Sequence, residues 1–185
     1  MRILQLHCDS IEYNPTKKEI RSAEDIKPEP KKIDEVVVAF IAIEQGDDSE
    51  IAQKAITEIM TSMDKVGCKK LLLYPYAHLS SNLAPPNVAL SLLKEMEAAA
   101  SNVDVSHAPF GWTKSYNVKV KGHPLAESSK VFTKEHDEKT GHNHDHSHEH
   151  DDEGQSSEAL KSESKIKSFW YILSPDGSMT EVGKF

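Results

Sequence analysis

Three stretches of the sequence carry residue types that could do chemistry. The first is YPYAHLSS, residues 74–81, which follows an apolar run and presents one histidine and two serines. Polar residues just after a buried strand are a favoured position for a site in α/β sheets. No aspartate lies beside His78 in the sequence to orient it, so a nucleophilic serine of the Ser-His-Asp kind is disfavoured. An ordinary loop histidine stays an alternative.

The second stretch, residues 108–127, interleaves aromatic and basic residues. Such interleaving suits stacking on nucleobases and pairing with phosphates. The alternative is an amphipathic hairpin with lysines on its wet face. The residues concerned are Phe110, Trp112, Lys114, Tyr116, Lys119, Lys121 and His123.

The third stretch is a histidine tract in which imidazoles recur at every second position: His142, His144, His146, His148 and His150. Imidazoles at this spacing can chelate Zn, Ni or Cu weakly from a flexible chain. The spacing gives no preorganised tetrahedral site. A solvated low-complexity linker that binds metal without consequence is the competing interpretation.

Composition excludes several classes of protein. The 185 residues are 37% hydrophobic and 28% charged, which suits one domain with an appendage. The net charge of −8 does not exclude a nucleic-acid partner, because much of the acidity lies in residues 134–153. Two cysteines without a pairing pattern favour a reducing compartment. The sequence has no apolar run of membrane-spanning length, no signal peptide and no glycine-rich phosphate loop.

The patterning predicts an α/β domain with a β-rich core and two main helices. Strands are expected at 2–7, 35–44, 70–74, 103–107 and 115–120, with a hairpin at 11–20 around Asn14-Pro15. One helix should begin near 47–49 and end at Gly67; the other should run from Pro85-Pro86 to about Ala100, burying Val88, Leu92, Leu93 and Met96. Residues 122–132 are expected to form a short closing helix.

Three regions follow from the changes in composition. Residues 1–132 form the folded domain, and residues 133–165 are expected to be an acidic, His-rich disordered linker. Residues 166–185, with SFWYIL before the turn Ser174-Pro175-Asp176-Gly177, predict a hairpin that begins a further domain. The chain is therefore expected to be the front of a longer protein.

Five segments together resemble a known family. MRILQLHCDSIEY, DEVVVAFIAIE, YPYAHLSS, APFGW-x-K and KGHPLAE are similar, in order and spacing, to the N-terminal editing domain of archaeal threonyl-tRNA synthetase, over about residues 1–132. The later hairpin resembles the start of the next segment of such a synthetase. The family's aminoacylation core would lie beyond Phe185.

The resemblance implies a D-aminoacyl-tRNA deacylase-like fold, a homodimer, and hydrolysis of serine wrongly attached to tRNA(Thr), in the cytoplasm and away from membranes. It implies catalytic roles for His78, Lys114 and Glu127, with help from the 2′-hydroxyl of the terminal adenosine. Editing would need no cofactor; ATP and zinc would belong to the synthetase core. Trp112 and Thr113 stand where the family usually has tyrosines, so Thr113, Tyr116 or a water would supply the missing hydroxyl.

The chemistry fits this assignment. One methyl group separates threonine from serine and is worth only about 1–3 kcal/mol, so a second site that excludes the larger residue is needed. The expected lining residues of this small pocket are Ala39, Phe40, Ile41, Ala77, Phe110, Trp112 and Thr113. Lys114 would stabilise charge on the carbonyl oxygen or anchor the substrate. His78 would bind the ribose or the water, and Glu127 would orient Lys114 or the substrate's ammonium.

Two other classes stay open. One is a free-standing trans-editing factor, or a D-aminoacyl-tRNA deacylase, since fold alone does not separate these activities. The other is a metal-handling protein that acts through the histidine tract. Ester hydrolysis that a chelator does not affect would favour editing, whereas metal-dependent activity would favour the metal protein.

Overall fold

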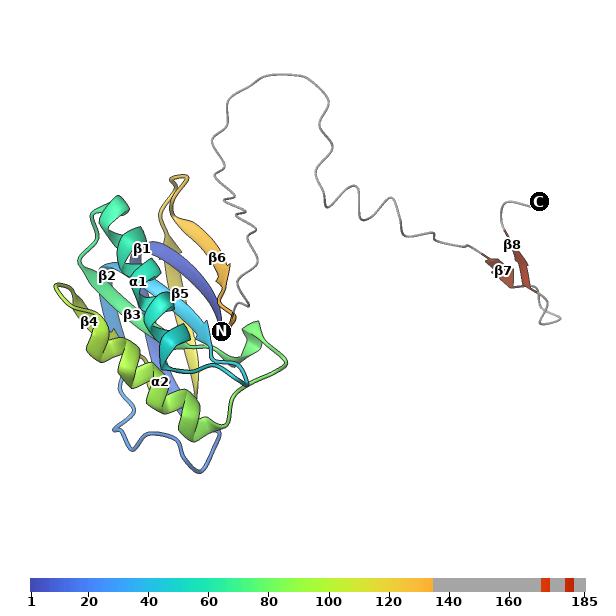
Figure 1. Cartoon of the computed structure of the whole chain (residues 1–185), viewed down its shortest axis with the longest axis horizontal. Coiled ribbons are helices and arrows are strands. Elements are labelled where there is room, and N and C mark those ends of the chain that lie inside the picture. The colour runs from blue at the N-terminus through green and yellow to red at the C-terminus, as the bar shows by residue number, and fades with distance from the viewer. Residues whose placement is uncertain (135–170, 174–178, 182–185) are drawn as a thin grey trace, which may run out of the picture. The chain divides into compact units, whose positions relative to one another are not determined.

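A mixed six-stranded sheet forms the frame of the first of two units, Met1–Asn143. The computed structural model describes residues 1–134, 171–173 and 179–181. The strand order is β4-β3-β2-β1-β5, and β6 also pairs with β1. Neighbours β2, β3 and β4 are parallel, whereas β1 is antiparallel to β2, β5 and β6 (Figure 1). The strands are β1 (Arg2–Lys18), β2 (Lys31–Ala42), β3 (Lys70–Pro75), β4 (Asp104–His107), β5 (Trp112–Val120) and β6 (Glu127–Val131).

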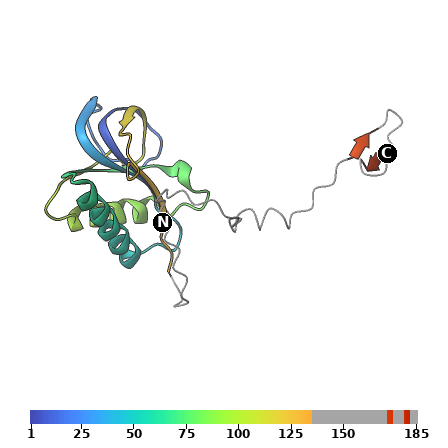
Figure 2. The same cartoon turned by 90° about the horizontal axis from the view of Figure 1, so that it is seen from above.

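Two helices, α1 (Ser49–Val66) and α2 (Pro86–Ala99), cover the same face of this sheet (Figures 1 and 2). The Asp48 carboxylate accepts hydrogen bonds from the first-turn amides of α1, and Gly67 ends the helix with a φ of 67°. Pro86 stands in the first turn of α2, where its missing N–H costs nothing. Both predicted helices are confirmed.

Buried side chains lie on both faces of the central strands. Val36, Val38 and Phe40 of β2 pack on the face away from the helices, while Val37, Ala39 and Ile41 pack against α1 and α2. The prediction of a central strand buried on both faces is confirmed. A parallel strand with two buried faces reads as a continuous apolar run rather than an alternating one.

The predicted hairpin at 11–20 is wrong, because β1 continues without a turn to Lys18. Pro15 lies beyond the last β1–β2 pair, Tyr13 with Lys31, so β2 requires no N–H from it. On the other edge, the pairing with β5 shifts register between Pro15 and Lys17, where a bulge absorbs the irregularity.

The predicted closing helix at 122–132 is also wrong. Residues 127–131 form β6, which pairs with Arg2–Leu6 on the edge of β1 that β5 leaves open. Pairing with a strand that is distant in the sequence therefore decides the structure of these residues.

On α2, Val88 is not buried as expected. It is 36% exposed, and the neighbouring Ala89 packs into the core instead.

Both cysteines, Cys8 and Cys68, are buried and free. In the described ranges, no helix is long and apolar enough to cross a membrane. In the second unit, β7 (Tyr171–Leu173) and β8 (Met179–Glu181) pair antiparallel, which confirms the two arms of the predicted hairpin. The predicted linker, apart from residues 133 and 134, and the histidine tract lie outside the described residues.

Candidate functional site

A mainly apolar cavity of about 600 Å³ opens at the carboxyl ends of the parallel strands β2 and β3. In open α/β sheets this is where ligands bind. The loop after β3, the start of α2, the loop after β4 and the first residues of β5 complete its wall. The lining residues are Glu19, Ile20, Ile41, Ala42, Ile43, Tyr74, Pro75, Tyr76, Ala77, His78, Leu83, Ala84, Pro86, Ala89, Leu93, Phe110, Gly111, Trp112, Thr113, Lys114 and Tyr116.

Lys114 is the cation of this cavity. Its Nζ donates hydrogen bonds to the carbonyl oxygens of Pro109, at 2.9 Å, and Trp112, at 3.0 Å, and it lies 4.9 Å from the centre of the Tyr74 ring. Burial lowers the pKa of Lys114 to about 8, and the charge of Glu24 opposes this change. Within the described ranges no carboxylate lies within ion-pair distance of Nζ. Lys114 can therefore stabilise an anion that forms beside it.

His78 lies in a single turn of 3₁₀ helix, Ala77–Leu79, on the loop that leaves β3. Its side chain meets the ring of Tyr76 edge-on, with 5.3 Å between the ring centres. The described part of the chain gives the imidazole no hydrogen-bond partner. Both ring nitrogens of His78 are therefore available to a ligand.

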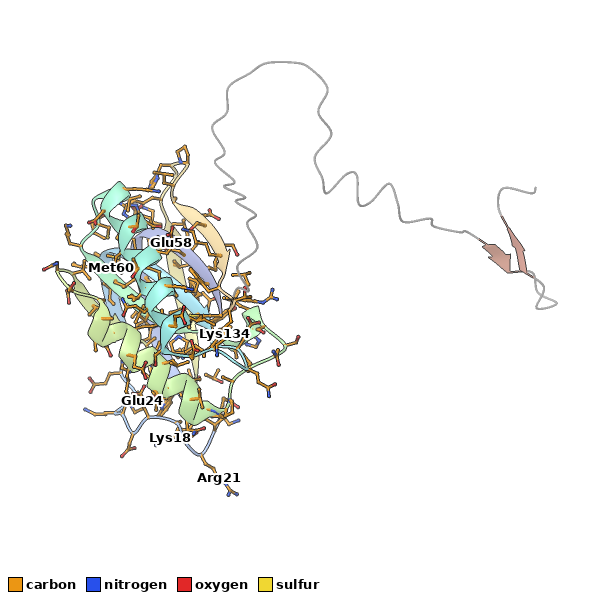
Figure 3. All side chains as sticks on the ribbon, in the orientation of Figure 1. Lys18, Arg21, Glu24, Glu58, Met60 and Lys134 are labelled. Atoms are coloured by element: carbon orange, nitrogen blue, oxygen red, sulfur yellow. The ribbon has the colours of Figure 1, made fainter. Side chains whose placement is uncertain are left out.

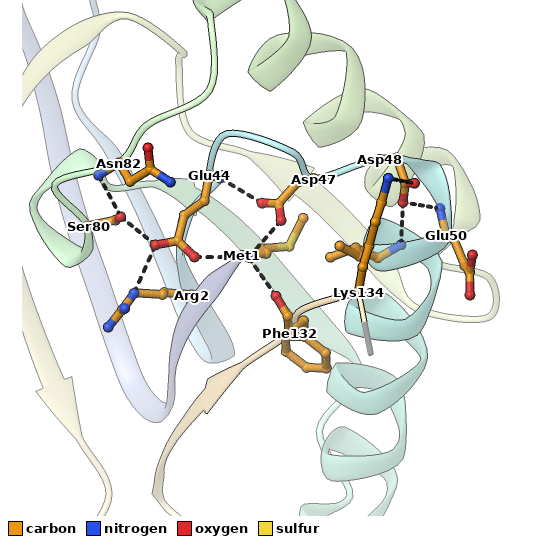
Figure 4. Close-up of polar contacts among 11 residues, drawn as sticks. Met1, Arg2, Glu44, Asp47, Asp48, Glu50, Ser80, Asn82, Phe132 and Lys134 are labelled. Carbon is orange, nitrogen blue, oxygen red and sulfur yellow. Dashed lines mark hydrogen bonds and ion pairs between the residues drawn. The ribbon is translucent and has the colours of Figure 1, made fainter. Parts of the chain in front are cut away.

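The serines of this loop do not form a catalytic triad with His78. Ser80 Oγ donates to Glu44 Oε1 at 2.5 Å and accepts from the Asn82 amide at 3.0 Å. Glu44 also pairs with Arg2 Nε at 2.9 Å and with the amino group of Met1 at 3.1 Å (Figure 4). Ser80 therefore anchors the loop, which agrees with the weak case for a nucleophilic serine.

The structure brings most of the predicted site residues together. His78 and Lys114 line one cavity with five of the seven predicted wall residues: Ile41, Ala77, Phe110, Trp112 and Thr113. Ala39 and Phe40 do not line it. Ala39 packs under the helices, and Phe40 packs on the opposite face against Tyr74, with ring centres 4.9 Å apart.

Glu127 does not line this cavity with His78 and Lys114. It is the first residue of β6, where it pairs with Leu6 of β1. The pairing of β6 with β1 fixes the position of Glu127, and the alternation of side chains along a strand fixes the face on which it lies. Neither depends on the loop that carries His78. Its catalytic role stays a prediction from the resemblance.

The hydroxyl of Thr113 is already engaged, because it donates to Glu19 Oε1 at 2.8 Å. This hydrogen bond and the pairing with Lys17 lower the pKa of Glu19. Tyr116, two residues beyond Lys114 on β5, lines the cavity and places its hydroxyl 3.4 Å from that of Tyr76. The predicted sources of the missing hydroxyl were Thr113, Tyr116 and a water. Of these, Tyr116 brings a phenol hydroxyl to the cavity wall.

Sequence reasoning missed an aromatic cluster at one end of the cavity. The Tyr74 ring packs edge-on against Tyr13 and Tyr116, with ring centres 5.9 and 5.8 Å apart. Its hydroxyl is buried and has no hydrogen-bond partner within the described ranges. Burial, with the nearby Tyr116, Tyr13 and Tyr76, raises the pKa of Tyr74, so the phenol stays protonated. The run YPY, two tyrosines around a proline, was the available signal.

Metal binding finds no support in the described ranges, where no cluster of three or more His, Cys, Asp or Glu side chains could hold an ion. Two imidazoles meet where His7 Nδ1 lies 2.9 Å from His123 Nε2. Burial and the charges of His123 and Lys121 lower the pKa of His7, which keeps this pair compatible with a neutral hydrogen bond.

Residues 1–132 match the family model described as the archaea-specific editing domain of threonyl-tRNA synthetase. The chain is 62% identical to the threonine--tRNA ligase of Nitrosopumilus maritimus and 51% identical to that of Cenarchaeum symbiosum. It is 39% identical to the threonine--tRNA ligase of Pyrococcus horikoshii. Each match covers 100% of this chain but only 28–29% of the relative, so the chain spans less than a third of their length.

Among solved structures, the chain is similar to the c-Myc DNA Unwinding Element Binding Protein, with a TM-score of 0.54 over 72% of this chain and 99% of the other. At 10% identity this likeness shows the fold alone. That fold is the D-aminoacyl-tRNA deacylase-like one, so the predicted fold class is confirmed.

Proposed function

Because this chain belongs to the family of archaeal editing domains of threonyl-tRNA synthetase, we propose that its cavity hydrolyses the ester of tRNA(Thr) mischarged with serine. The observation that carries the proposal is the Lys114 ammonium, which is partly buried in the cavity wall and free of a carboxylate partner among the described residues. Water adds to the ester carbonyl, and negative charge develops on the carbonyl oxygen. Lys114 donates to that oxygen.

Neither His78 nor Ser80 is arranged as a strong base in the cavity. His78 has no orienting carboxylate in the described ranges, and Ser80 is held by Glu44. The terminal ribose carries a 2′-hydroxyl beside the scissile ester, and we infer that this hydroxyl positions or activates the attacking water. His78 then binds the ribose or the water. The products are serine and tRNA(Thr) with a free 3′-hydroxyl.

Selectivity follows from size. Ala77, Phe110 and Gly111 are among the residues that line the cavity, and we infer that the seryl side chain packs against them. An additional methyl against a close-packed wall costs about 1–3 kcal/mol. Serine therefore fits where threonine does not.

The wider context completes the proposal. The domain acts as a homodimer in the cytoplasm on tRNA(Thr) that a threonyl-tRNA synthetase has mischarged. Editing itself uses no cofactor, and ATP and zinc belong to the aminoacylation core. The similarity of the whole chain to part of longer threonine--tRNA ligases supports a domain of a synthetase over a free-standing factor.

The test is a single-turnover comparison of seryl-tRNA(Thr) and threonyl-tRNA(Thr), with and without a chelator. We expect rapid loss of the serine ester, a spared threonine ester and no effect of the chelator. A D-aminoacyl-tRNA assayed in parallel tests the alternative activity, that of a D-aminoacyl-tRNA deacylase. Hydrolysis of the D-ester with the serine ester intact would overturn the proposal in favour of a D-aminoacyl-tRNA deacylase.

A further inference from the structure

A histidine held between two carboxylates lies beside the cavity without lining it. His107, the last residue of β4, places Nδ1 2.7 Å from Glu97 Oε2 of α2 and Nε2 3.0 Å from Glu24 Oε2. All three side chains are mostly buried, with exposed fractions of 18% for His107, 30% for Glu97 and 16% for Glu24. An imidazole donates through both nitrogens only when it carries two protons, so its cationic form satisfies both carboxylates.

Glu24 joins this histidine to the cavity wall. Its Oε2 accepts a hydrogen bond from the Phe110 amide at 2.8 Å, and its backbone oxygen accepts from Trp112 Nε1 at 2.8 Å. Burial raises the pKa of Glu24. The hydrogen bonds from Phe110 and His107 and the charges of His107 and Lys94 lower it. Together they outweigh burial, so the pKa of Glu24 falls below its ordinary value. An ionised carboxylate is therefore bound to the wall.

The segment that carries Glu24 lies directly on the loop after β4. Gly111 has a φ of +77°, and a Cβ at that position would lie 2.8 Å from the Cα of Ala23 and from Cγ1 of Ile20. The Glu19 amide also donates to the Gly111 oxygen at 2.9 Å. Figure 3 shows Glu24 beside α2, whereas Arg21 on the same segment points away from the domain.

The loop held by Glu24 also holds Lys114. The Lys114 ammonium donates to Pro109 and Trp112, which flank Phe110 and Gly111 on either side. The contacts thus run from Glu97 and His107 through Glu24 to the loop 109–112, and from that loop to Nζ of Lys114. Glu24 acts on Lys114 through space as well, because its charge raises the pKa of Lys114 and so favours the ammonium form.

We propose that Glu24, oriented by His107, is a positioning residue that fixes the loop 109–112 and thereby sets both the place and the charge of the Lys114 ammonium. The rate effects of this inference rest on the proposed function, whereas the titration of Lys114 does not.

The experiment compares Glu24→Gln and His107→Gln with the full chain and with Glu95→Gln as a matched control. Glu95 lies on α2 like Glu97 but bonds to Ser49 and Ser91 instead of His107. The first readout is the titration of Lys114 Nζ by NMR, assigned by comparison with Lys114→Arg. Loss of the carboxylate should lower the pKa of Lys114, because a nearby negative charge no longer favours the ammonium.

The second readout is single-turnover hydrolysis of seryl-tRNA across pH. We expect Glu24→Gln to lose about 10- to 100-fold in rate, as misplaced catalytic groups do, and its alkaline limb to move to lower pH with Lys114. His107→Gln should show a smaller loss of rate, because the Phe110 amide still donates to Glu24, and no fall in the pKa of Lys114, because the Glu24 carboxylate remains. Glu95→Gln should match the unmodified chain in both readouts.

The outcomes separate the two claims. An unchanged Lys114 titration in Glu24→Gln overturns the positioning role, whatever the rate. A shifted titration in a chain that does not hydrolyse seryl-tRNA supports the positioning role and refutes the proposed function. Should Glu24→Gln unfold, His107→Gln decides by the single-turnover rate, since it removes the imidazole and leaves the hydrogen bond between Glu24 and Phe110. A rate equal to that of Glu95→Gln would overturn the positioning role.

Discussion

Replacing Lys114 by Met should remove a pH-dependent cost to the stability of the domain and make it less active at neutral pH. Met keeps most of the volume and removes the charge. Folding lowers the pKa of Lys114 from its ordinary 10.5 to about 8, chiefly through burial, so the buried ammonium costs stability wherever it is protonated. A tenfold difference in proton affinity between the folded and unfolded chains corresponds to about 1.4 kcal/mol, which gives a cost of roughly 3–4 kcal/mol below pH 8.

The sign of the pH dependence follows from proton binding. Between pH 8 and 10.5 the unfolded chain holds a proton on Lys114 that the folded chain has lost. The free energy of unfolding of the unmodified chain therefore rises with pH across this window by about 3–4 kcal/mol from this group, and Lys114→Met lacks that rise. The difference between the two chains isolates this contribution, since every other titrating group is common to both.

The assay is urea unfolding of both chains, followed by circular dichroism at pH 7, 8, 9 and 10. The stability of Lys114→Met relative to the unmodified chain should be greatest at pH 7 and should fall above pH 8. In parallel, hydrolysis of seryl-tRNA should fall about 100-fold, because one electrostatic donor to the oxyanion is lost. Parallel stability curves would refute the burial argument, and an unchanged rate would remove Lys114 from the chemistry.

Three further predictions concern the linker, the ribose and the loop glycine. Deleting residues 142–150 should leave deacylation unchanged in a rate assay, because the tract is not needed to preorganise a site; a loss that zinc restores would support the metal interpretation. Seryl-tRNA with a 2′-deoxy terminal adenosine should be nearly inert, and hydrolysis at full rate would make His78 the base. Gly111→Ala should destabilise the domain by more than about 1 kcal/mol in urea unfolding, because its Cβ would meet Ala23 and Ile20 at 2.8 Å. An unchanged stability would show that the segment with Ile20 and Ala23 moves to accommodate the methyl group.

Local signals predicted the elements that local physics decides. Asp48 and Gly67 bound α1, Pro86 begins α2, and the apolar run around Val36–Ala42 became a strand buried on both faces. The errors fall where distant pairing decides. β1 runs through Asn14-Pro15 because β5 pairs with it, and residues 127–131 extend because Arg2–Leu6 needs a partner.

The same division holds for the site. The family resemblance indicated His78, Lys114 and Trp112, and the argument for a small pocket indicated Phe110. The structure places all four around one cavity. It gave no sign of Glu24, which is 83 residues from His107 in the chain and meets it only after β4 and the segment beyond β1 come together. No short-range pattern encodes such a contact. Glu127 remains apart from the cavity.

The central claim is that the seryl ester binds in the cavity between His78 and Lys114. A non-hydrolysable analogue, in which an amide joins serine to the 3′ position of adenosine, tests this claim most directly. In a crystal structure of the full chain with this analogue, we expect the seryl carbonyl oxygen within hydrogen-bond distance of Lys114 Nζ and the ribose beside His78. With the matched threonyl analogue under the same conditions, we expect no analogue bound in the cavity. A seryl analogue bound elsewhere, with this cavity unoccupied, would contradict the account.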